Sequence, residues 1–109
     1  MSICYDLKMY KGADFVFEFR LRSDDEYINP ELVTFKAADS PSDAVLISKS
    51  TSTGGIEIDA NDKYLITITV PFSETDAITV PRLYYEIDAT IGSIRYRKLM
   101  GNINVYEGL

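Results

Sequence analysis

Apolar and polar residues alternate with a period of two along most of this chain. The clearest run covers residues 15–22, FVFEFRLR, where phenylalanine or leucine occupies every second position. Further alternating runs cover residues 33–37, 64–70, 83–91 and 94–105. A period of two is that of a β-strand, whose successive side chains point to opposite faces. The pattern therefore predicts an all-β chain.

The same alternation predicts which side chains are buried. One parity of each run is apolar, and we expect it to form a dry core rich in phenylalanine. A run at residues 44–48 is apolar on both faces and leaves its register open. Gly54-Gly55 predicts a tight turn into a short strand. The predicted core residues are Phe15, Phe17, Phe19, Phe35, Ile66, Ile68, Tyr85 and Ile87.

One short segment is a helix candidate, at residues 73–78. Ser73 can act as its N-cap, an acidic residue follows in the first turn, and Pro81 ends the segment. We expect this helix to bridge two sheets and close one end of the core. No helical pattern of ten residues separates the strands, which argues against a parallel α/β fold. Short strands divided by turn residues predict an antiparallel sandwich or small barrel, with the 109 residues forming one domain, 1–109.

The composition excludes several classes of function. The sequence contains no histidine, which removes Ser-His-Asp and Cys-His nucleophile systems and imidazole metal sites. Cys4 is the single cysteine, so an intrachain disulfide and a C-x-x-C zinc ribbon are excluded. The net charge of −6 has the wrong sign for a phosphate backbone or an anionic membrane. We expect no cofactor, no metal, no nucleic-acid partner and no membrane partner.

No run of residues is apolar enough to span a bilayer. Residues 1–6 lack the basic and apolar regions of a signal peptide, so we expect folding in the cytoplasm.

Acidic residues gather at two turns and on one strand face. Asp24-Asp25-Glu26 lacks the alternating ligand spacing and the glycine of a calcium loop. Residues 59–62, DAND, are more typical of a turn whose side chains bond their own backbone, although a weak surface calcium site stays open. Glu86 and Asp88 share a strand face and could pair as glycosidase carboxylates. A charged outer face opposite basic residues is the favoured interpretation.

Basic residues concentrate at two places, at positions 20 and 22 and at 95, 97 and 98. Tyr96 has the opposite parity from Arg95 and Arg97, so a stacking ring and these charges would not share a surface, as single-strand nucleic-acid binding requires. We find no catalytic constellation and expect no enzyme. The residues that we propose as binding contacts are Tyr84, Arg95, Arg97 and Tyr106.

The order of motifs resembles that of small β-sandwich proteins from phages and prophages. Residues 10–19, YKGADFVFEF, are similar to their "G-x-D-x-x-F-x-F" opening, and a turn at residues 29–32 follows. Residues 74–87 then match a segment that leads into a tyrosine-rich strand, except that Pro81-Arg82 replaces the usual glycine. Residues 97–105 resemble the final strand. The similar family is the N-terminal domain of upper baseplate proteins of long-tailed phages, with short stand-alone prophage homologues.

This resemblance implies an antiparallel immunoglobulin-like β-sandwich that acts as a non-enzymatic adaptor in a phage tail or baseplate. Its partners would be other tail or baseplate proteins, and self-association is left open. The protein would occupy the host cytoplasm during assembly and then the virion tail. The alternative is a carbohydrate-binding module that uses exposed tyrosines. Stacked tyrosines on an open face beside carboxylates would favour that alternative, whereas core tyrosines and a long unpaired strand edge would favour the adaptor.

The pairing of the last two strands can be predicted residue by residue. Gly92-Ser93 has the length and the leading glycine of a type II′ hairpin turn. This turn places Ala89 opposite Tyr96 and Asp88 opposite Arg97, the latter as an exposed pair. The next pair would bury Lys98 opposite an inward isoleucine, which the cost of burying a charge forbids. We therefore expect a β-bulge within residues 97–101.

Overall fold

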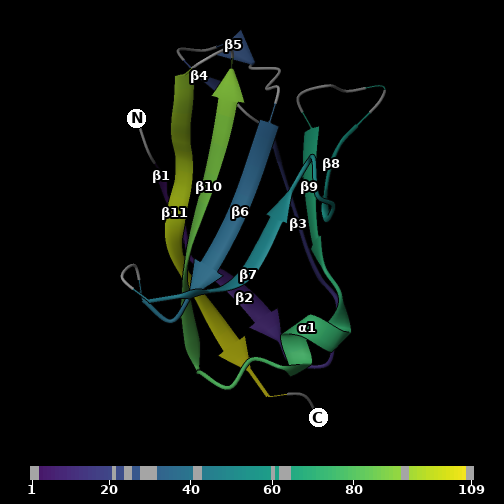
Figure 1. Ribbon diagram of the computed structural model, residues 1–109, viewed down its shortest axis with the longest axis vertical. Coiled ribbons are helices and arrows are strands. Elements are labelled where there is room, and N and C mark those ends of the chain that lie inside the picture. Colours follow the sequence, from purple (N-terminus) through teal and green to yellow (C-terminus); the bar gives the residue numbers. More distant parts are fainter. Residues whose placement is uncertain are drawn as a thin grey trace.

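The computed structural model describes residues 3–20, 22–23, 26–27, 32–40, 43–59, 61, 65–91 and 94–107. Two β-sheets pack face to face in it, with a short hairpin at one end and a helix at the other (Figure 1). The predicted all-β class with one short helix is confirmed.

The larger sheet contains six strands in the order β1-β11-β10-β6-β7, with β2 also pairing with β11. Its antiparallel centre forms because β10 pairs with β6 on one side and with β11 on the other. The two N-terminal strands instead run parallel to β11. The strands are β1 (Ile3–Cys4), β2 (Leu7–Tyr10), β6 (Leu32–Ala38), β7 (Val45–Ser50), β10 (Arg82–Ile91) and β11 (Ile94–Tyr106).

The smaller sheet contains three antiparallel strands in the order β3-β9-β8. These are β3 (Phe15–Arg20), β8 (Ile56–Ile58) and β9 (Leu65–Val70). A separate two-stranded hairpin consists of β4 (Arg22–Ser23) and β5 (Glu26–Tyr27). Strand β8 follows Gly54-Gly55 and β9 lies within residues 64–70, as the sequence predicts for both.

The core lies between the two sheets and is aromatic at its centre. Phe35 is fully buried, with its ring centroid 6.4 Å from that of Phe15 and 6.1 Å from that of Tyr85. Six of the eight predicted core residues are buried. Phe17 and Phe19 have the predicted inward parity but are only half-buried. In the described residues β3 is an edge strand, which leaves both rings partly exposed, so Phe17→Ala should cost less than truncation of a fully buried phenylalanine.

The pairing of β10 with β11 confirms the predicted register. Ala89 lies opposite Tyr96 and Asp88 opposite Arg97, and the register then shifts so that Ile87 lies opposite Leu99. Lys98 is the extra residue of this bulge, so it does not lie opposite the buried Ile87. The turn residues Gly92 and Ser93 lie outside the described residues.

Helix α1 (Phe72–Asp76) joins the smaller sheet to the larger one, as expected. It begins one residue before the predicted segment, and Pro71 rather than Ser73 is its N-cap. Pro71 offers no side-chain cap, and the backbone N–H of Phe72 donates instead to Asp14 Oδ1 at 2.8 Å. The Thr75 hydroxyl donates to the carbonyl of Ala13 at 2.9 Å. The start of β3 therefore holds the helix, through contacts that are distant in sequence.

Candidate functional site

The outer face of the larger sheet carries two of the four proposed contact residues. Tyr84 on β10 and Tyr106 on β11 both have the parity opposite to the buried residues Leu83 and Ile103. Tyr84 lies opposite Asn102 on β11, and Tyr106 lies four residues further on, about 13 Å along the strand. The two tyrosines therefore share a face without touching.

Arg95 and Arg97 lie at the other end of β11. Their backbones are opposite Thr90 and Asp88 on β10, and their side chains fall outside the described part of the chain. Along β11 both arginines are separated from Tyr106 by the bulge at Lys98. The backbone thus divides the four predicted contacts into two groups.

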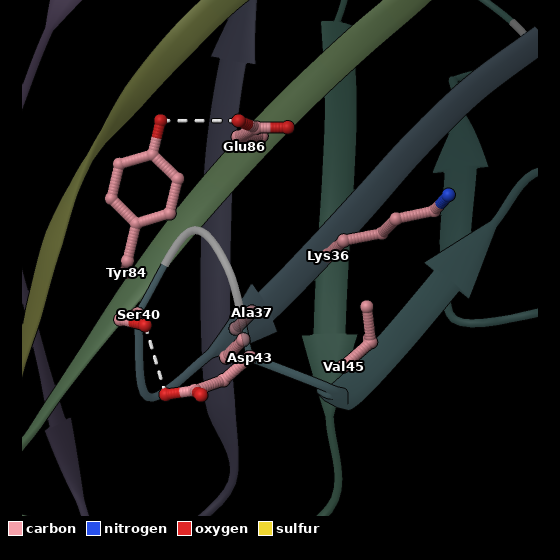
Figure 2. Close-up of a pocket in the computed structure, with 8 residues that line it drawn as sticks. Lys36, Ala37, Ser40, Asp43, Val45, Tyr84 and Glu86 are labelled. Carbon is pink, nitrogen blue, oxygen red and sulfur yellow. Dashed lines mark hydrogen bonds between the residues drawn. The ribbon is translucent and has the colours of Figure 1, made fainter.

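A small pocket lies beside Tyr84, and Figure 2 shows the side chains around it. The Tyr84 hydroxyl donates to Glu86 Oε1 at 3.1 Å, and the Ser40 hydroxyl donates to Asp43 Oδ2 at 2.8 Å. Lys36 lies directly opposite Glu86 on β6, which gives the rim charges of both signs. The volume is about 80 Å³, room for roughly two or three water molecules. This space suits a single protruding side chain and is far below that of a small-molecule cleft.

A second, shallower hollow of about 390 Å³ continues along the same face. It is lined by Asp39, Pro81, Arg82 and Asn104. Arg82 pairs with Asn104 in register, two residues from Tyr84 on β10 and two from Tyr106 on β11. This hollow therefore lies between the two proposed tyrosine contacts.

Tyr106 forms an aromatic pair with Tyr10. The two residues are opposite each other in the parallel ladder of β2 and β11, and their ring centroids lie 5.4 Å apart at 28°. Tyr10 is 53% exposed and Tyr106 is 41% exposed. Lys11 Nζ lies 3.9 Å from Glu107 Oε1 beside this pair.

We call Tyr10, Arg82, Tyr84, Asn104 and Tyr106 together the tyrosine surface. The sequence interpretation missed Tyr10, Arg82 and Asn104. Lys8 and Tyr10 alternate with the buried residues Leu7 and Met9. This alternation is visible in the sequence and would have predicted that Tyr10 is exposed. The pairing of β2 with β11 could not be predicted from the residues of either strand alone.

The carboxylate of Asp88 was predicted to be exposed, and this is wrong. Asp88 is only 8% exposed, whereas Glu86 on the same face is half-buried. The reason is that β10 is a central strand, so that β6 covers Asp88 from one side, at Thr34, and β11 flanks it on the other. A buried and a half-buried carboxylate on one flat sheet face do not make the open cleft that glycoside hydrolysis needs.

The acidic turn at Asp59 behaves as its composition predicts. The backbone N–H of Asn61 donates to Asp59 Oδ1 at 2.8 Å, so this carboxylate serves the turn itself. Asp24, Asp25 and Asp62, and the side chain of Glu26, lie outside the described residues. Within the described ranges, no three acidic, histidine or cysteine side chains gather closely enough to hold a metal ion.

We expect calcium to leave the thermal stability unchanged. A ligand that binds only the folded protein raises its stability by RT ln(1 + [L]/Kd), so even a modest site would shift the melting temperature. Differential scanning fluorimetry with 5 mM EDTA and then with excess calcium measures this. A calcium-dependent rise of several degrees would show that one of the acidic turns binds the ion.

No helix in the described ranges is long and apolar enough to cross a membrane.

Comparisons with known proteins identify the fold. No known protein family and no curated protein matches the chain. Among solved structures, Tim-1 is similar over 100% of this chain and 97% of its own, with 12% identity and a TM-score of 0.55. A marsupial T cell receptor is similar over 95% of this chain, at 12% identity and a TM-score of 0.56, and the match spans 50% of the receptor chain. The chain therefore folds as an antiparallel immunoglobulin-like β-sandwich.

Proposed function

We propose that this protein is a non-enzymatic structural adaptor of a phage or prophage tail or baseplate, and that it docks other tail proteins on the tyrosine surface. The motif order in the sequence supports the tail context. The observation that carries the docking function is an exposed aromatic and polar surface, formed by β2, β10 and β11, whose hollows are shallow.

The composition of the tyrosine surface suits contact with another protein. Tyrosine and arginine are enriched among the residues that dominate binding energy, because each buries a large area with few rotatable bonds or several donors. Tyr106 and Arg82 are exposed, and Asn104 adds a half-buried polar group between them. The pocket beside Tyr84 can accept one side chain of a partner.

The absence of histidine from the sequence supports a non-enzymatic role. On the tyrosine surface, the Tyr84 hydroxyl donates to the carboxylate of Glu86 on the same strand. No nucleophile on this surface sits next to a base within an enclosed cleft, which covalent and acid–base catalysis both require.

A carbohydrate-binding module is the second candidate. Tyr10 and Tyr106 stack on an open face, and the exposed carboxylate of Glu107 lies beside them, which is an arrangement that can bind a sugar ring. Against this, Tyr85 is fully buried, and in the described residues β3 presents a six-residue edge that pairs on one side. Both features favour the adaptor.

The test is to co-express the protein with each product of the neighbouring genes and to analyse the mixtures by size exclusion with light scattering. We expect a stable complex with at least one tail protein. Tyr106→Ala should weaken it by about tenfold or more, as truncation of an interface anchor does. Glu57→Ala on β8, an exposed change on the other sheet, is the matched control and should leave the affinity unchanged.

Two results would contradict the proposal. One is a protein that forms no complex with any neighbouring gene product. The other is oligosaccharide binding on a glycan array that Tyr106→Ala abolishes, which would establish the second candidate instead.

A further inference from the structure

Strand β3 is an open edge of the smaller sheet. In the described part of the chain it pairs only with β9, from Phe15 opposite Val70 to Arg20 opposite Leu65. The ladder has no register shift, and the strand contains no proline. Such a straight edge presents a row of backbone donors and acceptors to any second strand.

The hydrogen bonds of the sheet identify which groups face outward. Thr69 N–H donates to Gly55 O, and Asp59 N–H donates to Leu65 O, so the odd-numbered residues of β9 bond to β8. The even-numbered residues of β9 therefore bond to β3, where they lie opposite Phe15, Phe17 and Phe19. The N–H and C=O groups of the alternate residues Val16 and Glu18 must then point away from the sheet.

Strand β7, an edge of the larger sheet, is protected in a way that β3 is not. On β7 the ladder with β6 shifts register between Ala37 and Ala38, and such a bulge disrupts pairing. Ser50 N–H donates to Gly54 O, and Gly54 N–H donates to Ser50 O, so the chain itself occupies the end of β7. Within the described residues, β3 has neither protection.

Apolar side chains accompany the open edge. Phe17 and Phe19 are half-buried and stack with ring centroids 5.5 Å apart. Tyr5, which is 55% exposed, places its ring centroid 6.3 Å from that of Phe17. Val16, on the other face of β3, is 56% exposed.

We propose that β3 pairs with β3 of a second copy of this chain, antiparallel and centred on Phe17, so that the two small sheets join into one. Centring on Phe17 places Val16 opposite Glu18 of the second copy, which matches the outward-facing backbone groups of each strand. Phe17 then lies opposite its own copy at the position where cross-strand side chains come closest.

Charge favours this register over its two immediate neighbours. Centring on Phe17 places Asp14 opposite Arg20 of the second copy, twice in the symmetric dimer. Centring on Val16 would place Asp14 opposite Glu18, and centring on Glu18 would place Glu18 opposite itself. Like charges directly opposite each other are destabilising, so these neighbouring registers are disfavoured. A strand whose two halves complement each other in this way fits a second copy of itself through a two-fold axis.

Crosslinking tests the register. In a Cys4→Ser background, Val16→Cys and Glu18→Cys replace exposed side chains, so both variants should keep the fold. Mixed in equal amounts and oxidised, the two variants should give the disulfide-linked heterodimer as the main crosslinked product. Either variant alone should crosslink little, because identical positions would lie roughly 8–9 Å apart, beyond disulfide reach. Crosslinking of either single variant as efficiently as the mixture would overturn the register.

Proline substitution tests the edge itself. Val16→Pro removes an N–H that points outward, so it should leave the fold intact and abolish the dimer in sedimentation experiments. Ser48→Pro on β7 is the matched control, since its N–H also faces away from the sheet, and it should leave the dimer unchanged. A wild-type protein that stays monomeric at 1 mM, or a dimer lost with Ser48→Pro and kept with Val16→Pro, would refute the proposal. This pairing is separate from the tyrosine surface, which lies on the other sheet.

Discussion

Replacing Phe35 by alanine should lower the free energy of unfolding by about 3–5 kcal/mol, the usual cost of deleting a fully buried phenylalanine. Phe35 has no exposed surface and contacts the rings of both Phe15 and Tyr85, so the change would leave a cavity lined by both sheets. The chain has one cysteine and therefore no intrachain disulfide, so the two sheets are held together by core packing of this kind without a covalent bridge. Urea unfolding at equilibrium measures the loss.

Phe72→Ala is the matched control for that change. Phe72 lies at the start of α1 and is 60% exposed, so its truncation should cost less than about 1 kcal/mol. A loss below 1 kcal/mol for Phe35→Ala would show that the ring does not sit at the centre of the core.

Gly101→Ala should lower the free energy of unfolding by about 2–5 kcal/mol, from backbone strain and from a steric clash together. Gly101 has a φ of +153°, and a Cβ there would collide with the backbone carbonyl of Tyr5. That segment cannot retreat easily, because Tyr5 N–H donates to Met100 O at 2.9 Å and the Tyr85 hydroxyl donates to the Tyr5 carbonyl. The methyl group would push the link between β1 and β2 away from β11.

Gly54→Ala is the control that separates the cost of backbone strain from the cost of the steric clash at Gly101. Gly54 also has a positive φ, of +111°, but a Cβ there would meet nothing within 4 Å. We expect this variant to lose only the part due to backbone strain, about 1–3 kcal/mol. Equal losses in the two glycine variants, measured in the same urea titrations, would contradict the clash with Tyr5.

Local pattern was sufficient for β3 and for β6 to β11, and for one register, but it did not predict β1 or β2. The inward parity of Tyr85 and Ile87 follows from a side-chain period of two, and a two-residue turn fixes the count across β10 and β11. The bulge at Lys98 followed from the cost of burying an amine. These features depend only on residues near one another in sequence.

Features set by distant neighbours could not be predicted in this way. Phe17 has the right parity but is half-buried because its strand lies at an edge, and Asp88 is buried because its strand is central. Strand order determines both, and alternation does not encode strand order. The same limit applies to α1, whose cap comes from Asp14, 58 residues away.

The candidate site shows the same division. Tyr84 and Tyr106 were proposed as contacts from the sequence, and the structure places both on the outer face of the larger sheet. The companions of Tyr106 could not be found, because Tyr10 reaches it only through the parallel pairing of β2 with β11. For Arg95 and Arg97 the predicted register is confirmed, and their role in binding stays a prediction.

The parallel docking of β1 and β2 onto β11 has a consequence for synthesis on the ribosome. Asp6 accepts a hydrogen bond from the backbone of Asn102, a partner made 96 residues later. At translation rates of about 5–20 residues per second, the N-terminal segment waits roughly 5–20 s for its binding site to exist. During that interval Leu7 and Met9, both buried in the finished domain, stay exposed on the nascent chain. Strands β1 and β2 are therefore among the last of this domain to fold although they are made before β11, and chaperones that recognise apolar segments have time to bind them.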